Sequence, residues 1–262
     1  MRRPLPLALV VLLAAMVAMF GHHSPTRLDP SLAWAPPTYD RPLGSGEGGV
    51  DLLSLVAHAE LRGIVLAVVV AAVGFLLGTP LGAAAAFARG PFERAVARTC
   101  DLLQAFPTFL LALVVLSAVH TPTRWHLGLV FSLTAWAPFA RLALAQSRVL
   151  RGAAFVDASI ALGQTPPRVF WHHVLPNLLG VVNVQLGSTG SSIIVSEAAL
   201  AFVGFGPRDG VSLGNVLDQG VASMLRAPHV LATGALAVFV TSAAMLAFAR
   251  SPRGARQYQK DQ

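Results

Sequence analysis

The sequence predicts an all-α, polytopic membrane protein with six transmembrane helices and a helical cytoplasmic loop between the fourth and the fifth. Hydrophobic residues make up 55% of the 262 residues and charged residues only 12%, and the mean hydropathy is +0.64. Soluble domains carry about 25% charged residues. Six long runs lack charge almost entirely, and basic residues gather in alternate segments between them. Much of the surface must therefore face lipid rather than water.

The uncharged runs define the predicted spans. A helix needs about 17–25 apolar residues to cross about 30 Å of hydrocarbon. The first run, residues 5–21, is interpreted as a retained anchor. A cleaved signal peptide is the alternative, because Arg2 and Arg3 precede the run and a polar Gly-His-His segment follows it. The fourth run is short and reaches span length only if the Arg141 side chain extends to the interface. The other spans are residues 63–88, 102–119, 125–140 with its extension to 146, 177–196 and 227–249.

The distribution of charge orients these spans. Four segments hold 13 of the 19 basic residues, and they alternate with segments that hold the other six. Because Lys and Arg gather in cytoplasmic loops, the alternation predicts a multi-pass membrane protein with both termini in the cytoplasm. A nucleic-acid-binding protein would instead concentrate basic side chains on one soluble face. The Arg-rich segments are residues 1–4, 89–101, 141–177 and 250–262.

The chain is therefore divided into four parts. An N-terminal anchor (1–21) is followed by an extracytoplasmic loop (22–62), which is rich in Pro and Gly. The transmembrane core (63–250) contains the cytoplasmic loop 151–177, and a basic cytoplasmic tail (251–262) completes the chain. Within the core, Gly74, Gly78 and Gly82 repeat every four residues. This spacing predicts close helix packing, with a pore wall as the alternative.

Nothing in the sequence predicts a nucleotide site, a metal site or an enzyme active site. The glycine run at residues 44–49 lacks the Gly-Lys-Ser/Thr that follows in a phosphate-binding loop. The single cysteine excludes a Cys-based metal site, and adjacent histidines point to different sides of a helix. No Ser-His-Asp set that would indicate a catalytic triad can be identified in the sequence. We therefore expect this chain to bind no cofactor and no metal, so any ATP chemistry belongs to a partner.

The loop between the fourth and fifth spans predicts two short helices at an angle. Residues 153–162 are small or apolar and favour a helix. Gly163 is a natural helix terminator, and the following Thr-Pro-Pro forces a turn. Residues 168–175 are expected to form the second helix, which Pro176 ends. Such a bent pair suits docking into a groove of a partner, while an element that only packs on lipid is the alternative. The apolar edge is predicted at Val156, Ile160 and Ala161.

This loop resembles the "EAA" loop of ABC importer permeases, which reads Glu-Ala-Ala, three residues, Gly, and later a hydrophobic residue followed by Leu-Pro. Two departures are present, Asp for Glu and Ser for the second Ala, and they keep the charge and the small size. Further matches are to the peptide-importer version of the loop. The residues that carry the resemblance are Asp157, Ala158, Ser159, Gly163, Arg168, His173, Val174, Leu175, Pro176 and Asn177.

Other blocks resemble the "C"-type permeases of the dipeptide, oligopeptide and nickel group. They are residues 41–45 with Asp51, then residues 101–107, 196–206 and 213–215. Gly46 and Val50 stand where this group has Asp and Arg. The function of those two charges is therefore either absent from this chain or carried by other residues. The similarity covers about residues 41–250.

The resemblance implies a six-helix permease subunit, in the cytoplasmic membrane of a bacterium, of an ATP-driven importer that translocates dipeptides or oligopeptides. Its implied partners are a second, related permease, two ABC ATPases that dock on the loop and hold ATP and Mg²⁺, and an extracytoplasmic solute-binding protein. A nickel or other small-solute permease of the same group is the alternative. A membrane enzyme and a structural scaffold are more distant alternatives.

Polar residues near the fifth span are candidates for the translocation path. Glu197 follows that span and is expected at the outer interface, where it lines a path or gate, is a solvated carboxylate, or is the partner of an arginine outside the span. Gln185 and Asn183 lie within the span, where polar side chains line a path or hold helices together.

Overall fold

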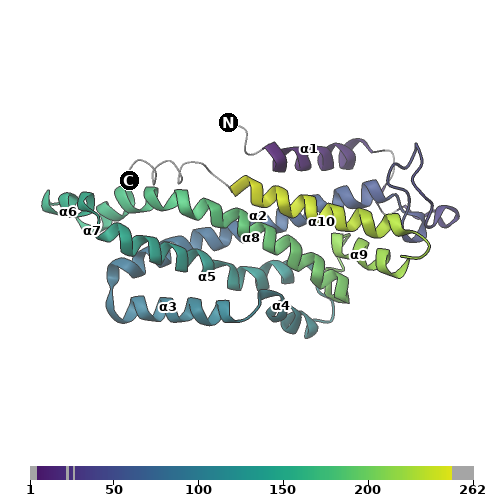
Figure 1. Ribbon diagram of the computed structural model, residues 1–262. Coiled ribbons are helices and arrows are strands. Elements are labelled where there is room, and N and C mark those ends of the chain that lie inside the picture. Colours follow the sequence, from purple (N-terminus) through teal and green to yellow (C-terminus); the bar gives the residue numbers. More distant parts are fainter. Residues whose placement is uncertain (1–4, 22–23, 26, 250–262) are drawn as a thin grey trace.

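The computed structural model describes residues 5–21, 24–25 and 27–249. Long helices lie side by side in an elongated bundle, with short helices and loops at its two ends (Figure 1). Within the described residues the only strand-like pairing is an isolated bridge between Ser45 and Asp51, so the predicted all-α class is confirmed. The helices are α1 (Leu5–Phe20), α2 (Leu52–Ala88), α3 (Gly90–Ala105), α4 (Thr108–Ser117), α5 (Arg124–Arg151), α6 (Ala154–Ala161), α7 (Pro166–Val169), α8 (Leu175–Leu200), α9 (Leu213–Ala222) and α10 (Pro228–Ala249), with π-helical turns η3 (Phe170–Val174) and η4 (Ala201–Phe205).

The described part of the chain holds four helices that are long and apolar enough to cross a membrane. They are α2, α5, the continuous helix Phe170–Phe205 and residues 228–248 of α10. The bent pair α3–α4 makes a fifth span if it is counted as one, and α1 is a shorter apolar helix of 16 residues. The multi-pass architecture therefore agrees with the sequence, although the count of six full-length spans is not reproduced.

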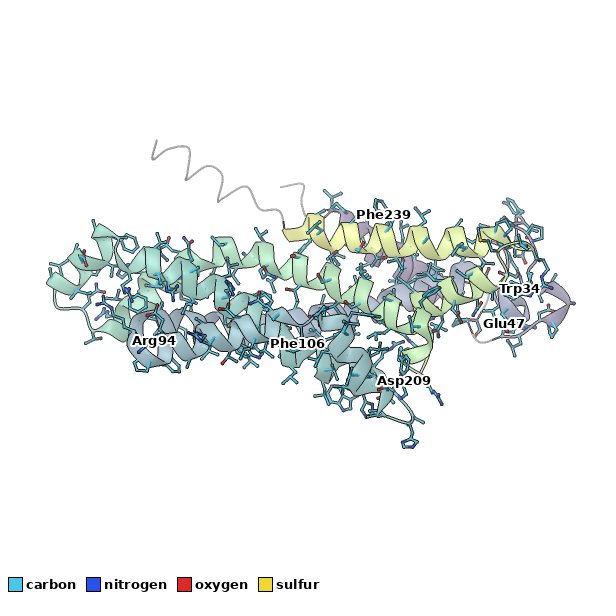
Figure 2. All side chains as sticks on the ribbon, turned by 60° about the horizontal axis from the view of Figure 1, so that its bottom comes forward. Trp34, Glu47, Arg94, Phe106, Asp209 and Phe239 are labelled. Carbon is cyan, nitrogen blue, oxygen red and sulfur yellow. The ribbon has the colours of Figure 1, made fainter. Side chains whose placement is uncertain are left out.

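The predicted third span, residues 102–119, is wrong as a single straight helix. The chain bends by 74° between α3 and α4, at Phe106 and Pro107 (Figure 2). Proline disfavours helical geometry in the residue before it, and Phe106 has φ −93° and ψ 127°, which is extended. The absence of charge in residues 102–119 indicates only that the segment is apolar enough to enter lipid. It does not indicate the local break in the helix.

Helix α2 begins well before the predicted span, at Leu52. The Asp51 carboxylate accepts a hydrogen bond from the Ser54 backbone N–H at 2.9 Å, which satisfies one of the free donors of the first turn. Residues 52–62, expected in the outer loop, are therefore helical. The fourth span extends through Arg141, as predicted, because α5 runs without interruption to Arg151.

The second short helix of the loop does not end at Pro176. Pro166–Val169, η3 and α8 follow one another directly, and the helix is continuous from Phe170 to Phe205. Proline has no N–H and normally breaks the helix when it falls in its interior. Here the turn before it is widened to π geometry, in which the Leu175 N–H donates to the Phe170 carbonyl five residues back. The widened turn lets the chain pass Pro176 and remain helical.

The bundle has two distinct ends, which we name after the helices found there (Figure 1). The α6 end holds the α2–α3 turn, the C-terminus of α5 and the short helices α6 and α7. The α9 end holds residues 27–51, the α4–α5 connection and the turn from α8 to α10. The arginines of two predicted cytoplasmic segments, 89–101 and 141–177, gather towards the α6 end. Ion pairs join α3 to α5 there: Arg148 donates to Glu93 at 2.6 Å, and Arg141 pairs with Asp101.

The glycine stripe of α2 provides its contact with α5, as the four-residue spacing predicted. A Cβ atom built on Gly74 would lie 2.7 Å from the Ala135 carbonyl oxygen. On Gly78 it would lie 2.2 Å from the Trp136 oxygen, and on Gly82 2.0 Å from the Ala140 oxygen. These distances are shorter than real side chains allow, so the two backbones touch only because no side chain stands between them.

Candidate coupling loop and intramembrane cavity

The turn after α6 is a complete Schellman motif. The Gly163 N–H donates to the Ile160 carbonyl at 2.9 Å, and the Gln164 N–H donates to the Ser159 carbonyl at 3.1 Å. This pair of bonds requires a left-handed residue at the first position after the helix cap, and Gly163 has φ +81°. The Ser159 hydroxyl donates to the Phe155 carbonyl at 2.7 Å. The sequence therefore sets a fixed bend between α6 and the helix that follows.

The inner face of the loop packs onto the bundle. Val156 is 1% exposed and belongs to the same apolar cluster as Val169, Val174 and Leu178. The Phe155 and His173 rings lie 6.3 Å apart and join α6 to η3. The prediction that Val156 forms part of the exposed edge is therefore wrong, because this side of α6 supplies the contact that holds the loop in place.

The outer face of the loop is apolar and exposed. Ile160 is 52% exposed and Leu162 is 84% exposed, and Phe155 and Trp171 are also exposed. Large apolar side chains that face water within one short segment are typical of a docking surface. We call these four residues the coupling edge. Of the residues singled out in the sequence, Asp157, Ala158, Gly163, Arg168 and Pro176 are exposed, His173 and Leu175 are half-buried, and Ser159 is buried.

A small polar cavity of about 130 Å³ lies between α4, α5 and α8. Gln185, Thr189, Ser192 and Ser196 line it from α8, and Thr134 faces it from α5. The Gln185 amide donates to the Thr189 hydroxyl at 3.1 Å. Spacings of three and four residues put these side chains on one helix face. A cavity with several polar groups inside an apolar bundle can hold water or a polar part of a solute.

The structure separates the two polar residues that the sequence grouped together. Gln185 is half-buried in the cavity, whereas Asn183 is exposed. Two residues apart on a helix, they cannot share a face. Sequence reasoning missed Ser192, Ser196 and Thr134. The spacing of polar residues along α8 could have identified Ser192 and Ser196. Nothing in the sequence indicates that α4 and α5 pack against that face of α8.

Glu197 is buried inside the α9 end and does not lie free at an interface. Its side chain is 5% exposed, and a Cβ atom on Gly63 of α2 would lie 3.1 Å from its Oε2 atom. The strongest charge acting on it is that of Arg124, at the start of α5. The Arg124 backbone N–H donates to Asp209, on the loop before α9 (Figure 2). The interpretation of Glu197 as a solvated carboxylate is therefore wrong, whereas its interpretation as the partner of an arginine agrees with the neighbouring charge of Arg124.

Comparison with known proteins gives this architecture a family. The family model for the binding-protein-dependent transport system inner membrane component matches residues 78–254. A Brucella suis protein described as a peptide transport system permease is 33% identical over 221 residues, which is 82% of this chain and 73% of that protein. The oligopeptide transport system permease protein of Bacillus subtilis is 26% identical over 85% of this chain and 73% of its own length. The glutathione transport system permease protein of Pectobacterium atrosepticum is 27% identical over 76% of this chain and 66% of its own length.

A solved structure supports the same fold. The MetNI methionine ABC transporter, in an inward-facing conformation, matches with a TM-score of 0.58 and 18% identity, covering 75% of this chain and 95% of the matched chain. That likeness establishes the fold alone. The family match covers more than half of the sequence and includes the coupling edge, the polar cavity and Glu197. The chain belongs to the family of binding-protein-dependent transport system inner membrane components, and it is a multi-pass membrane permease.

Proposed function

We propose that this chain is one of two transmembrane permease subunits of an ATP-driven importer for peptides. The coupling edge carries the proposal: it is apolar, exposed and held at a fixed angle by the Schellman turn at Gly163. Apolar side chains on a preorganised helix fit a groove in a partner. The peptide class is supported by relatives that are described as peptide, oligopeptide and glutathione permeases.

The proposed assembly contains a related permease, two ABC ATPases that bind ATP and Mg²⁺, and an extracytoplasmic solute-binding protein. The α6 end faces the cytoplasm, because the arginine-rich segments 89–101 and 141–177 gather there. The alternation of basic segments along the sequence supports cytoplasmic termini. Bond chemistry takes place on the ATPases. This chain converts their closure into movement of its helices.

The continuous helix from Phe170 to Phe205 is the transmitting element. It has 36 residues, which corresponds to about 54 Å at about 1.5 Å per residue. One of its ends abuts the coupling loop, the polar cavity lies along it, and Glu197 lies near its other end. When an ATPase displaces α6, the packed contacts of Val156 and Phe155 displace η3 and therefore α8. The α8 wall of the cavity then shifts against α4 and α5.

The test is ATP-dependent uptake of a labelled dipeptide by the complete transporter in proteoliposomes. Gly163→Pro is expected to lower uptake at least about tenfold, because proline holds φ near −65° and removes the N–H that donates to Ile160. Gly163→Asn is the matched control, since Asn tolerates the left-handed conformation, and it should transport normally. Normal uptake by the Pro variant would refute coupling through this turn, and no uptake of any peptide by the unaltered complex would refute the peptide class.

The polar cavity is proposed as part of the translocation path. Gln185→Leu is expected to lower peptide uptake about tenfold while the melting temperature in detergent changes little, because the hydrogen bond that it removes joins two side chains of the same helix, α8. Asn183→Leu changes the same kind of side chain two residues away on the exposed face, and it should leave uptake unchanged. If Gln185→Leu lowers the melting temperature and transports normally, the residue holds helices together instead.

A further inference from the structure

An apolar groove runs between α2 and α5 at the α9 end of the bundle. Its volume is about 590 Å³. Val65, Val69 and Val73 line one wall from α2, and Leu129 lines the other from α5. Ser132 is the only uncharged polar side chain that lines it, and Arg62 and Arg124 lie at one end. We call this feature the α2–α5 groove.

The groove begins where the glycine stripe of α2 stops. From Gly74 to Gly82 the backbones of α2 and α5 touch, because no side chains separate them. One residue before Gly74 the lining begins with Val73, and valine side chains recur towards the α9 end. Towards the α9 end the face of α2 that packs on α5 carries Leu66, in one apolar cluster with Phe131 of α5. Val65 and Val69 lie beside that contact and are exposed, so they form one wall of the groove.

Among the described residues, neither arginine at the mouth of the groove forms an ion pair with a carboxylate side chain. The Arg124 side chain donates from Nη2 to the Val211 carbonyl at 2.7 Å, but its Nε atom is buried and has no hydrogen-bond partner. The charges of Glu197 and Asp209 act on Arg124, and the charge of Arg62 opposes it. Among the described residues, no acidic side chain lies within ion-pair distance of Arg62. Arg62 is exposed and, like Arg124, lines the groove, so an anion at the mouth can accept hydrogen bonds from the accessible donors of the two guanidinium groups.

The dimensions of the groove match one leaflet of a bilayer. From Arg62 to Val73, α2 rises about 16 Å at about 1.5 Å per residue. The hydrocarbon core of a bilayer is about 30 Å thick, so one leaflet is about half of that. Trp125, which is exposed beside Arg124, is typical of the level where headgroups begin. The arginines therefore lie at headgroup level, and the apolar walls lie at the depth of an acyl chain.

We propose that the α2–α5 groove binds an anionic phospholipid, with one acyl chain between Val65 and Val73 and the phosphate between Arg62 and Arg124. Arginine forms strong charge-assisted hydrogen bonds with phosphate oxygens. The walls argue against a peptide as the occupant, because away from the arginines and Trp125 its backbone amides would meet Ser132 as the one polar side chain among the described lining residues, and unpaired amides are costly in such a site.

The test is native mass spectrometry of the complete transporter, equilibrated in detergent with phosphatidylglycerol or phosphatidylcholine. The unaltered complex should retain phosphatidylglycerol in preference to phosphatidylcholine. Arg62→Gln should weaken that retention about tenfold, because a charge-assisted bond to the phosphate is lost. Val69→Trp should weaken it as well by filling the groove. Arg94→Gln, an exposed arginine on α3 towards the α6 end, is the matched control and should behave as the unaltered complex.

Three results would overturn the proposal. The first is equal retention of the two lipids by the unaltered complex. The second is loss of retention in Arg62→Gln but not in Val69→Trp, which would mean that a phosphate group binds the arginines without an acyl chain in the groove. The third is a photo-crosslinker at Val69 that attaches to the second permease and not to lipid, because the groove would then be a subunit interface. None of these measurements depends on peptide uptake, so the outcome is independent of the proposed function.

Discussion

Replacing Ile160 and Leu162 of the coupling edge together by glutamate is expected to abolish ATP-driven uptake and leave the membrane chain folded. Both side chains are largely exposed in the chain itself, so their loss removes little packing. In the proposed complex they become buried in a groove of the ATPase, where an unpaired carboxylate is strongly unfavourable. A few buried apolar anchors usually provide most of the affinity of an interface, and losing such an anchor costs at least about 2 kcal/mol.

The measurement is co-purification of the ATPase with the permease, followed by peptide uptake in proteoliposomes. Leu225→Glu is the matched control, because Leu225 is a fully exposed leucine at the opposite, α9 end of the bundle. That variant should keep both the ATPase and the uptake. Retention of the ATPase by the Ile160→Glu, Leu162→Glu variant would show that the coupling edge is not the docking surface, whatever the role of Gly163.

Replacing Gly82 by leucine is expected to destabilise the bundle by more than the about 1–3 kcal/mol typical of overpacked cores. A Cβ atom there would lie 2.0 Å from the backbone oxygen of Ala140, and a helix backbone cannot yield as a flexible side chain does. Helices α2 and α5 would have to separate over the length of the stripe. The variant should show a large fall in melting temperature in detergent, or fail to accumulate in the membrane.

The control for this effect is Gly180→Leu, on α8. Nothing lies within 4 Å of the Cβ position there, so the same change of residue meets open space. The melting temperature of this variant should stay close to that of the unaltered chain. Equal behaviour of the two variants would contradict the conclusion that direct backbone contact along the glycine stripe holds α2 against α5.

The coupling loop shows how local and distant effects combine. The bend at Gly163 was legible in the sequence because a Schellman turn depends on a few neighbouring residues and on one left-handed position. The face of α6 that packs inward was not legible, because Val156 is buried by Val169 and Leu178 from other helices. The same limit applied to Pro176, whose effect on the helix was decided by a widened turn five residues long.

The candidate path residues divide in the same way. Gln185, Asn183 and Glu197 were identifiable as polar groups in or beside an apolar span. Only the arrangement of α4, α5 and α8 separates Gln185, which lines a cavity, from Asn183, which is exposed. Glu197 is buried because Gly63 leaves room for its carboxylate and Arg124 supplies a neighbouring positive charge. Neither partner is close to Glu197 in sequence.

By itself the sequence determined the helical class, the apolar runs, the close contact at the glycine stripe and the bend after α6. Each of these depends on transfer to lipid, on residue size or on backbone conformation, and such contributions are properties of a short stretch of chain. The break at Pro107 also follows from a local restriction, that of proline on the residue before it. The tertiary structure alone decided the continuous helix past Pro176, the polar cavity and the α2–α5 groove. These features depend on which helices meet and at what distance, and that outcome is set by packing between residues that are far apart in the sequence.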